Sequence, residues 1–291
     1  MFSDFLQFLF SGITVGSMYA LGALGYALIY NASGVINFAQ GEFVMLGAMS
    51  AANLMLAGLS EPLAILVAVL VAVLAGLATE KFAIEPAKDS PIITLIVITL
   101  GVGSVIRGLV QVFLGKDNHV LPAFSGEKPI LLAGATLSPQ TLWVIGVTLV
   151  VVLILAWFFG KTTLGKATVA THHNKLAAQL VGINTHFILL LSFAFSAMLG
   201  AIGGIIVTPI TCTNYDSGLL LGLKGFAAAA IGGIGSGPGA IVGGLFLGVI
   251  EAMTAGYISS AYKDVVAFIL MLLIFFLIPH GLLGSKGPEV L

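Results

Sequence analysis

The stretch PLAILVAVLVAVLAGLAT, residues 62–79, decides the class of fold because it holds no charged side chain. A helix needs about 20 mostly apolar residues to cross the hydrocarbon of a bilayer. Only helices and closed barrels satisfy their backbone polar groups there, and continuous runs of this length indicate helices. Comparable apolar windows cover residues 11–30, 37–57, 92–114, 141–159, 187–207 and 265–279, and a glycine-interrupted region covers 222–256. The sequence therefore predicts an all-α, polytopic bundle with about eight or nine membrane elements.

The composition agrees with a chain whose surface mostly faces lipid. Hydrophobic residues make up 59% and charged residues 8% of it, whereas a soluble domain carries about 25% charged residues. So few charges cannot cover a water-facing surface. The net charge of -1 argues against nucleic acid as a partner, and Cys212, the only cysteine, excludes an internal disulfide and a cysteine-based metal site. We expect residues 1–291 to form a single transmembrane domain.

The hydrophilic segments set the expected orientation. Residues 160–186 carry Lys161, Lys166 and Lys175 and no acidic residue, and the positive-inside tendency places such a segment in the cytoplasm. Alternating spans then put Lys81, Lys88 and Lys286 inside, and Lys116, Lys128, Lys224 and Lys263 outside or at the outer interface. On this count the N-terminus lies outside, and the chain from residue 281 onward lies inside.

Glycine and proline crowd one segment, GGIGSGPG at residues 232–239. Proline removes a backbone donor, and each glycine lowers helix propensity by about 1 kcal/mol relative to alanine, so we expect the helix to be interrupted here. Interrupted backbone at membrane depth is tolerated only where protein or a water-filled cavity covers it. Gly235, Ser236 and Gly237 are therefore candidates to line a pathway or to form a hinge. Most other glycines, such as Gly12 and Gly16, are expected to permit close helix packing.

A weak internal repeat accompanies this break. The first half has a break at residues 31–34 followed by a small-residue helix with Glu42, and the second has a break at 235–239 followed by a small-residue helix with Glu251. The pattern fits a parallel duplication, which is a common way to build a transporter. Chance similarity between glycine-rich segments is the alternative.

Three ionisable residues fall within apolar spans: Glu42, Arg107 and Glu251. Such residues are costly in a membrane and usually face the interior of the bundle. Asn37 and Gln40 lie on or near the helical face of Glu42, so these five side chains are candidates to line a translocation pathway. A buried hydrogen-bond cluster between helices is the alternative for Glu42 and its neighbours. Arg107 could pair with either glutamate, or could extend to the membrane interface.

The sequence contains no catalytic motif. It lacks a Gly-x-Ser-x-Gly elbow, a His-Glu-x-x-His pair, a Walker loop that cradles phosphate, and a Gly-x-Gly-x-x-Gly after a strand. We therefore expect no enzymatic activity and no cofactor, and an energy-coupled function would need an ATPase on another chain. His172 and His173 point to different faces of a helix, so we expect them at the surface and expect no metal site.

Three stretches carry a resemblance: GSMYALGALGYALIYNASGVINFAQGEFVMLGA (residues 16–48), GIGSGPGAIVGGLFLGVIE (233–251) and YKDVVAFILMLLIFFLIPHGLLG (262–284). In order and spacing the chain resembles the LivH-type permeases of branched-chain amino acid ABC importers over nearly its whole length. The resemblance implies a multi-pass permease of the bacterial inner membrane with an amino-acid substrate. It also implies a LivM-like second permease, LivG/LivF-like ATPase subunits and a periplasmic or extracytoplasmic substrate-binding protein as partners.

The segment LGKATVATHHNKLAAQLVGIN, residues 164–184, looks like the ATPase-coupling segment of that family. By this match the residues expected to contact a nucleotide-binding subunit are Asn174, Ala177, Ala178, Gly182 and Ile183. Two positions depart from the family pattern: many relatives have His where this chain has Gln40, and many have Arg where it has Val169. The residues alone leave two readings open, because a mildly amphipathic helix over 177–184 could dock on a soluble partner or lie on the bilayer.

Two functions from different classes remain. The first is an ABC permease that works by alternating access and takes its energy from separate ATPase subunits. The second is a stand-alone secondary transporter or channel for a small polar solute such as urea or an amide. Secondary transporters often hold Asp, Glu or His relays for ion coupling, and this chain offers a sparse set.

Overall fold

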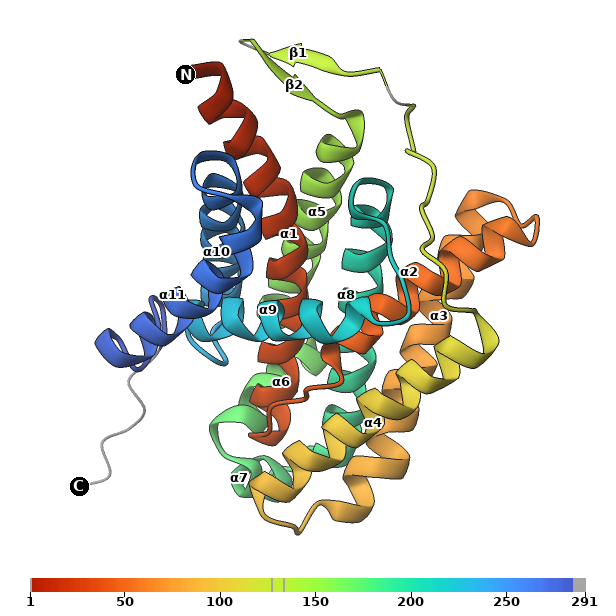
Figure 1. Cartoon of the computed structure of the whole chain (residues 1–291). Coiled ribbons are helices and arrows are strands. Elements are labelled where there is room, and N and C mark those ends of the chain that lie inside the picture. The colour runs from red at the N-terminus through yellow and green to blue at the C-terminus, as the bar shows by residue number, and fades with distance from the viewer. Residues whose placement is uncertain (1, 127, 133, 285–291) are drawn as a thin grey trace.

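The computed structural model describes residues 2–126, 128–132 and 134–284, and Figure 1 shows that helices dominate it. The helices are α1 (Phe2–Ser33), α2 (Gln40–Leu56), α3 (Glu61–Thr79), α4 (Ile92–Phe113), α5 (Pro139–Lys161), α6 (Thr163–His173), α7 (Lys175–Leu180), α8 (Thr185–Thr211), α9 (Ser217–Gly232), α10 (Gly237–Tyr257) and α11 (Lys263–Leu277). The strands β1 (Ile130–Leu132) and β2 (Ala135–Leu137) form one small antiparallel hairpin. The predicted all-α class is confirmed. Lys286, which entered the predicted charge count, lies outside the described residues.

Within the described residues, seven helices are long and apolar enough to cross a membrane. They are α1, α3 with its extension to Ala87, α4, α5, α8, α10, and α11 with the turn before it. Two further helices, α2 and α9, are shorter, with 17 and 16 residues. The predicted polytopic helical bundle is confirmed. The predicted number of eight or nine membrane elements is approximate, because it depends on whether the short helices α2 and α9 are counted.

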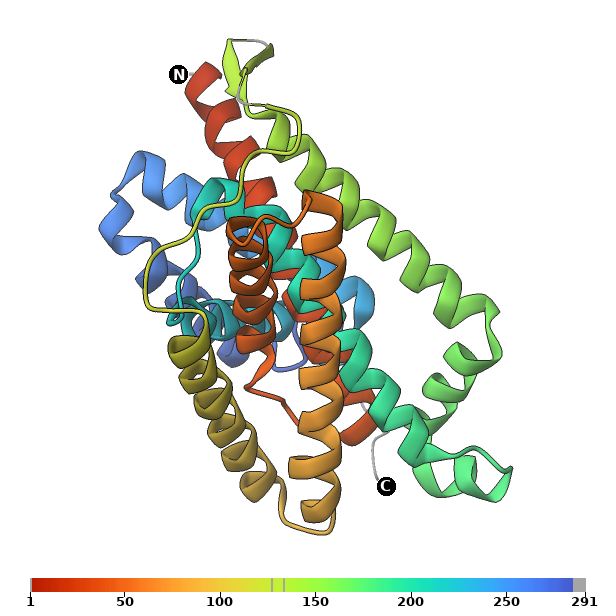
Figure 2. The same cartoon turned by 90° about the vertical axis from the view of Figure 1, so that its right-hand side faces the viewer.

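The most buried helix, α1, lies at the centre of the bundle. Helices α8, α9 and α10 pack around it, and Leu21 and Ile29 of α1 have no exposed surface. By contrast α3, α4, α5 and α11 lie at the periphery (Figures 1 and 2). They turn large apolar side chains outward, among them Leu74, Phe113, Trp157 and Phe276. Exposed apolar surface of this extent is typical of a protein that faces lipid or a partner.

Facing glycines allow α1 and α10 to pack closely. A Cβ atom at Gly16 would lie 2.9 Å from the carbonyl oxygen of Gly244, and one at Gly12 would lie 2.6 Å from Cα of Val249. A Cβ at Gly248 would collide with the backbone of Gly16. The predicted role of Gly12 and Gly16 in helix packing is confirmed.

The chain is interrupted in the segment where the sequence predicted a break. Helix α9 ends at Gly232, Gly233 and Gly235 adopt φ angles of 110° and 87°, and α10 begins at Gly237. Glycine suits these two positions because side chains strain the backbone at positive φ. Ser236 caps α10, its Oγ accepting a hydrogen bond from the backbone N–H of Gly239 at 3.1 Å. The region expected over residues 222–256 is therefore two helices, and the first begins earlier, at Ser217.

The two short helices begin inside the bundle and meet there. After α1, the chain turns at Gly34, where φ is 72°, and returns to start α2 at Gln40. After α8, the chain turns back and α9 lies across the bundle (Figure 1). The first turns of α2 and α9 touch, because a Cβ at Gly41 would collide with the carbonyl oxygen of Gly218. The sequence predicted a span over 37–57 and a break near residues 232–239, but not that α2 and α9 would meet inside the bundle.

The two predicted breaks are in contact. The side-chain Nδ2 of Asn31 donates a hydrogen bond to the carbonyl oxygen of Gly235 at 2.8 Å. The parallel duplication stays a prediction, since α1 has 32 residues and α9, its proposed counterpart, has 16. The structure adds that this hydrogen bond joins the last turn of α1 to the break that precedes α10.

Candidate functional site

An ion-pair chain joins α2, α4 and the start of α9. Glu42 lies in the first turn of α2 and is 2% exposed. Arg107 of α4 donates through Nη2 to Oε1 of Glu42, and its Nη1 lies 3.2 Å from Oδ1 of Asp216, which precedes α9. Of the predicted partners, Arg107 has therefore taken Glu42 and not Glu251. The guanidinium turns into the bundle and does not extend to the membrane interface.

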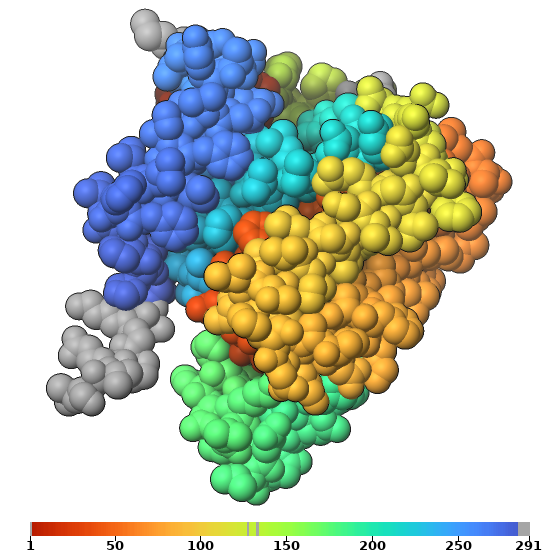
Figure 3. Space-filling model, turned by 60° about the horizontal axis from the view of Figure 1, so that its bottom comes forward, coloured from red at the N-terminus to blue at the C-terminus, as the bar shows by residue number. Residues whose placement is uncertain are grey.

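This ion-pair chain reaches the surface at one end. The side chains of Arg107 and Asp216 are 24% and 62% exposed, whereas that of Glu42 is 3% exposed. Figure 3 shows a hollow on this face, with α4 and α11 at its sides and α9 and the start of α2 at its floor. Arg107 and Asp216 come from two of the segments around this hollow, α4 and the start of α9, and a partly open charged pair between helices is suited to meet a polar solute.

A second buried ion-pair cluster joins α1, α9, α10 and α11. Lys224 Nζ lies 2.7 Å from Oε1 of Glu251 and 2.6 Å from Oδ1 of Asp264. The hydroxyl of Tyr19 donates to the other oxygen of Glu251 at 2.8 Å. Lys224 is 3% exposed, so its expected position outside or at the outer interface is wrong. Its long aliphatic stem and its paired ammonium group let the side chain stay buried inside the bundle.

Sequence analysis missed Lys224, Asp264 and Asp216 as members of these clusters. One signal was present: Lys224 is the only charge in the apolar run from Leu219 to Gly235. A lone cation in such a run, with a lone Glu251 in the next one, predicts a pair by the same cost argument that singled out Glu42. Asp216 and Asp264 lie at helix starts, where acidic residues are common for a local reason, the helix dipole.

Gln40 holds three helices together. Its Nε2 donates to the carbonyl oxygen of Ser196 in α8 at 3.0 Å. The single hydroxyl hydrogen of Ser196 lies between two acceptors, Gln40 Oε1 and the carbonyl oxygen of Gly25 in α1. Gln40 has no exposed surface, and neither has Asn37, whose Oδ1 accepts from the backbone N–H of Ala39 at 3.1 Å. The alternative of a buried hydrogen-bond cluster between helices thus describes Gln40, while Glu42 is held by Arg107.

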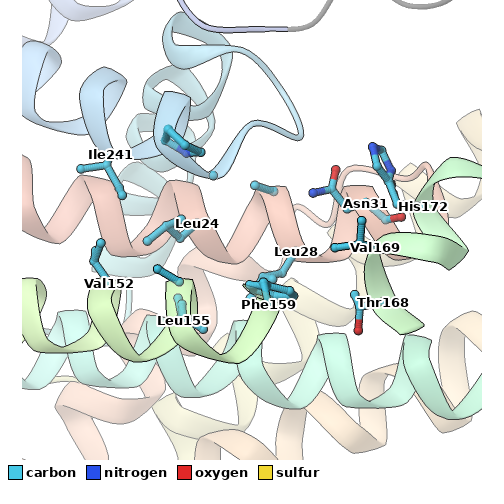
Figure 4. A pocket seen from close by; sticks show the side chains of 14 residues that line it. Leu24, Leu28, Asn31, Val152, Leu155, Phe159, Thr168, Val169, His172 and Ile241 are labelled. Carbon is cyan, nitrogen blue, oxygen red and sulfur yellow. Dashed lines mark hydrogen bonds between the residues drawn. The ribbon is translucent and has the colours of Figure 1, made fainter. Parts of the chain in front are cut away.

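The break between α9 and α10 adjoins a cavity of about 410 Å³. Figure 4 shows its walls, made by side chains of α1, α5 and α10, with Asn31 and His172 at one end. Gly237 is part of the lining, whereas Gly235 and Ser236 are not. Most of the wall residues, such as Leu24 and Leu155, are apolar, and Asn31, Thr168 and His172 are the polar ones, so most of this cavity suits a hydrocarbon group.

The segment expected to couple to an ATPase forms a short helical arm, α6 and α7, at one end of the molecule. Asn174 ends α6 and caps α7, its Oδ1 accepting from the backbone N–H of Ala177 at 2.9 Å. Gly182 ends the arm with φ at 86°. Ala178 is 3% exposed and packs inward, so of the five predicted contact residues it is not available to a partner. Ala177 and Gly182 are exposed and Ile183 is half-buried.

The tip of this arm carries large apolar side chains in the open. Leu176, Leu180 and Val181 are 74%, 89% and 77% exposed. In Figure 3 the arm projects from the rest of the bundle. Exposed apolar groups on a projecting arm are typical of a surface that docks on a protein or on a membrane.

Known proteins resemble this chain along most of its length. The model of the family described as "Branched-chain amino acid transport system / permease component" matches residues 8–275. The high-affinity branched-chain amino acid transport system permease protein LivH of Salmonella typhimurium is 35% identical, covering 99% of this chain and 98% of that protein. The corresponding BraD protein of Pseudomonas aeruginosa is 34% identical, with 98% and 97% covered.

More distant similarity points to the same kind of protein. The autoinducer 2 import system permease protein LsrC of Salmonella choleraesuis is 30% identical over 85% of this chain and 70% of that protein. Among solved structures, PsaBC from Streptococcus pneumoniae in complex with Fab superimposes with a TM-score of 0.53 at 14% identity, covering 96% of this chain and 97% of that one. This structural match supports the fold. The family match and the similarity to LivH show that the chain belongs to the family of permease components of branched-chain amino acid transport systems.

Proposed function

We propose that this chain is the membrane permease subunit of an ATP-driven importer for branched-chain or related hydrophobic amino acids. The observation that carries the proposal is the exposed apolar tip of the α6–α7 arm, with Leu180 89% exposed. Water around such a tip is unfavourable, and its position on an arm that projects from the bundle supports a protein partner over the bilayer surface. A soluble ATPase subunit that covers the tip removes this cost and gains a lever on the bundle.

The lever acts through α8. The arm leads directly into α8, which packs along α1, α2 and α3, so a displacement of the arm by closing ATPases would tilt the centre of the bundle. The breaks at residues 34–39 and 233–236 are the places where the backbone can absorb such a change. In this mechanism the bundle rocks between outward-facing and inward-facing states, and chemistry stays on the ATPases.

In this proposal the hollow between α4 and α11 forms this chain's half of the translocation pathway. A LivM-like second permease facing this hollow would complete it, with Arg107 and Asp216 exposed to the solute and Glu42 behind them. LivG/LivF-like ATPases would dock on the arm, and a periplasmic or extracytoplasmic binding protein would deliver the amino acid at the opposite end. This arrangement places the arm in the cytoplasm and the chain in the inner membrane.

Copurification tests the docking step. We expect Leu180→Asp to abolish recovery of the ATPase subunits with a tagged permease, because it puts a charge into an apolar contact. The matched control is Leu131→Asp, since Leu131 is 75% exposed in the hairpin at the other end of the molecule (Figure 1). Unchanged ATPase recovery with Leu180→Asp, from a correctly inserted protein, would remove the proposed docking surface.

A further inference from the structure

A π-helical turn at the end of α3 brings two carboxylates to one side. The helix continues from Thr79 into the π turn Glu80–Ile84, where the backbone N–H of Glu85 donates to the carbonyl oxygen of Glu80. In a regular α-helix, residues five apart point about 140° away from each other. The wider π turn stacks Glu85 close to Glu80, and such turns are frequent at functional sites.

A histidine from another helix faces both carboxylates. His186 lies in the first turn of α8, with Nδ1 3.5 Å from Oε1 of Glu80 and Nε2 3.4 Å from Oε1 of Glu85. One ligand atom from each of the three side chains lies within 4.8 Å of the others. Carboxylate oxygens and an imidazole nitrogen at this spacing are a donor set for a metal ion.

Glu80 is the member that lacks a partner. Its side chain has no exposed surface, and neither carboxylate oxygen accepts a hydrogen bond from any described residue. Buried carboxylates are normally hydrogen-bonded, paired or bound to a metal. Glu85 differs because its Oε2 is already held by Lys81 Nζ at 2.9 Å, which leaves Oε1 directed at His186. The buried carboxylate of Glu80 therefore faces the cluster without a hydrogen bond that would offset the cost of burying its charge.

A protonated imidazole does not meet that demand with the observed spacing. Charge-assisted N–H···O bonds are about 2.7–2.9 Å long, and both nitrogens of His186 are farther than that from the carboxylates. Two ligands bound at about 2.1 Å to one tetrahedral ion lie about 3.4 Å apart. His186 faces the two carboxylates through different ring nitrogens, and an imidazole binds one ion through only one of them. A shared ion would therefore take one nitrogen of His186 and one oxygen from each glutamate, atoms that lie within 4.8 Å of one another.

We propose that Glu80, Glu85 and His186 bind one divalent transition-metal ion of the Zn²⁺ or Mn²⁺ type. The imidazole ligand favours these ions over Mg²⁺ and Ca²⁺, which prefer oxygen ligands throughout. The bound ion ties the end of α3 to the first turn of α8, directly after the α6–α7 arm. It therefore stiffens the joint through which the arm moves the bundle. The site uses no residue of the ion-pair chain or of the arm tip.

Metal titration of the full-length permease in lipid nanodiscs tests the proposal. After stripping with a chelator, we expect Zn²⁺ to bind with a stoichiometry of one per chain by isothermal titration calorimetry, with a tenfold excess of Mg²⁺ unable to displace it. Glu80→Gln and His186→Asn should each weaken binding about tenfold or more, since each removes a direct ligand. The matched control His173→Asn, which removes an exposed histidine of the arm, should bind as the unmodified chain does.

Three results would overturn the proposal: no saturable Zn²⁺ binding, wild-type affinity in both ligand variants, or loss of binding in His173→Asn. Glu80 is buried, so Glu80→Gln is checked for folding by size-exclusion chromatography. His186, with a side chain 45% exposed, provides the variant that tolerates substitution. The titration needs no partner subunit, so its outcome is independent of whether the chain transports amino acids.

Discussion

In two groups inside this bundle, charged side chains are paired with one another. Glu42 has Arg107, and Lys224 has Glu251 and Asp264. A lone charge at membrane depth is costly, and a partner within hydrogen-bond distance reduces that cost. The two groups differ in the exposure of the cation, because the side chain of Arg107 is 24% exposed and that of Lys224 is 4% exposed, although each group also has a more exposed aspartate, Asp216 at 62% and Asp264 at 37%. We therefore assign the first group to the pathway and the second to holding the helices together.

Removing Lys224 from its ion-pair cluster should destabilise the fold. Lys224→Met leaves Glu251 and Asp264 without their cation, and breaking one side of a buried pair costs about 3 kcal/mol or more. Unfolding of the detergent-solubilised protein by sodium dodecyl sulfate measures the loss. Lys263→Met is the control, since Lys263 begins α11 without sharing this cluster. Equal stability of the two variants would contradict a structural role for Lys224.

Neutralising Glu42 should affect transport more than stability. Glu42→Gln keeps the size of the side chain and a hydrogen bond to Arg107, but frees the guanidinium to attract other anions. We expect the rate of amino-acid uptake to fall about tenfold, a loss of about 1.4 kcal/mol in barrier terms, while the yield of assembled complex stays near normal. Normal uptake by Glu42→Gln would assign Glu42 to packing alone.

Among elements, glycine contacts determine how the central helices approach. Gly12 and Gly16 of α1 meet Gly244 and Gly248 of α10 without room for a Cβ atom on either side. Helices in lipid associate through such close packing, because lipid tails are as apolar as leucine and no hydrophobic force drives the helices together. The spacing of glycines in the sequence predicted close packing but not which helix would be the partner, since that choice depends on the folded arrangement.

A side chain at this crossing should separate α1 from α10. Gly248→Leu places its atoms against the backbone of Gly16, and overpacking of a tight contact costs about 3 kcal/mol or more. The yield of monodisperse protein after detergent extraction should fall steeply. Gly146→Leu serves as the control, because a Cβ there meets nothing within 4 Å. Comparable yields from both variants would contradict the glycine packing described for this pair.

The arm depends on one glycine for its direction. Gly182 has a φ of 86° with nothing within 4 Å of an added Cβ, so a substitution there strains the backbone without creating a collision. We expect Gly182→Val to insert normally and bind ATPases, yet to uncouple ATP hydrolysis from uptake, because the turn between α7 and α8 would no longer hold its angle. The measured ratio of ATP hydrolysed to leucine imported should rise several-fold. An unchanged ratio would remove Gly182 from the coupling assignment.

At the scale of the whole molecule, hydropathy predicted the class of fold and the position of most helices. Long apolar runs such as residues 62–79 have one solution in lipid, so composition suffices to identify them. Composition identified α2 as the apolar window 37–57, but it did not fix the start of α9, which is stabilised by contacts with α1 and α2. The same limit explains Lys224: counting it as an outside charge was reasonable locally and wrong once α9 turned across the bundle.

The candidate site was predictable in part for a similar reason. Glu42, Arg107 and Glu251 stand out as charges in apolar runs, whereas Asp216, Asp264 and Tyr19 join them only through tertiary contacts. The arm was identified by its resemblance to a family segment, and the structure adds that its apolar tip is exposed and that Ala178 is not part of it.

Reconstitution tests the central claim, that force for transport comes from a separate ATPase acting through the arm. Purified permease is placed in liposomes with or without its second permease, ATPase subunits and binding protein, and uptake of labelled leucine is measured with ATP supplied on the side of the arm. The proposal predicts accumulation against a gradient only when every component and ATP are present. Uptake by the isolated chain, driven by an ion gradient alone, would contradict it.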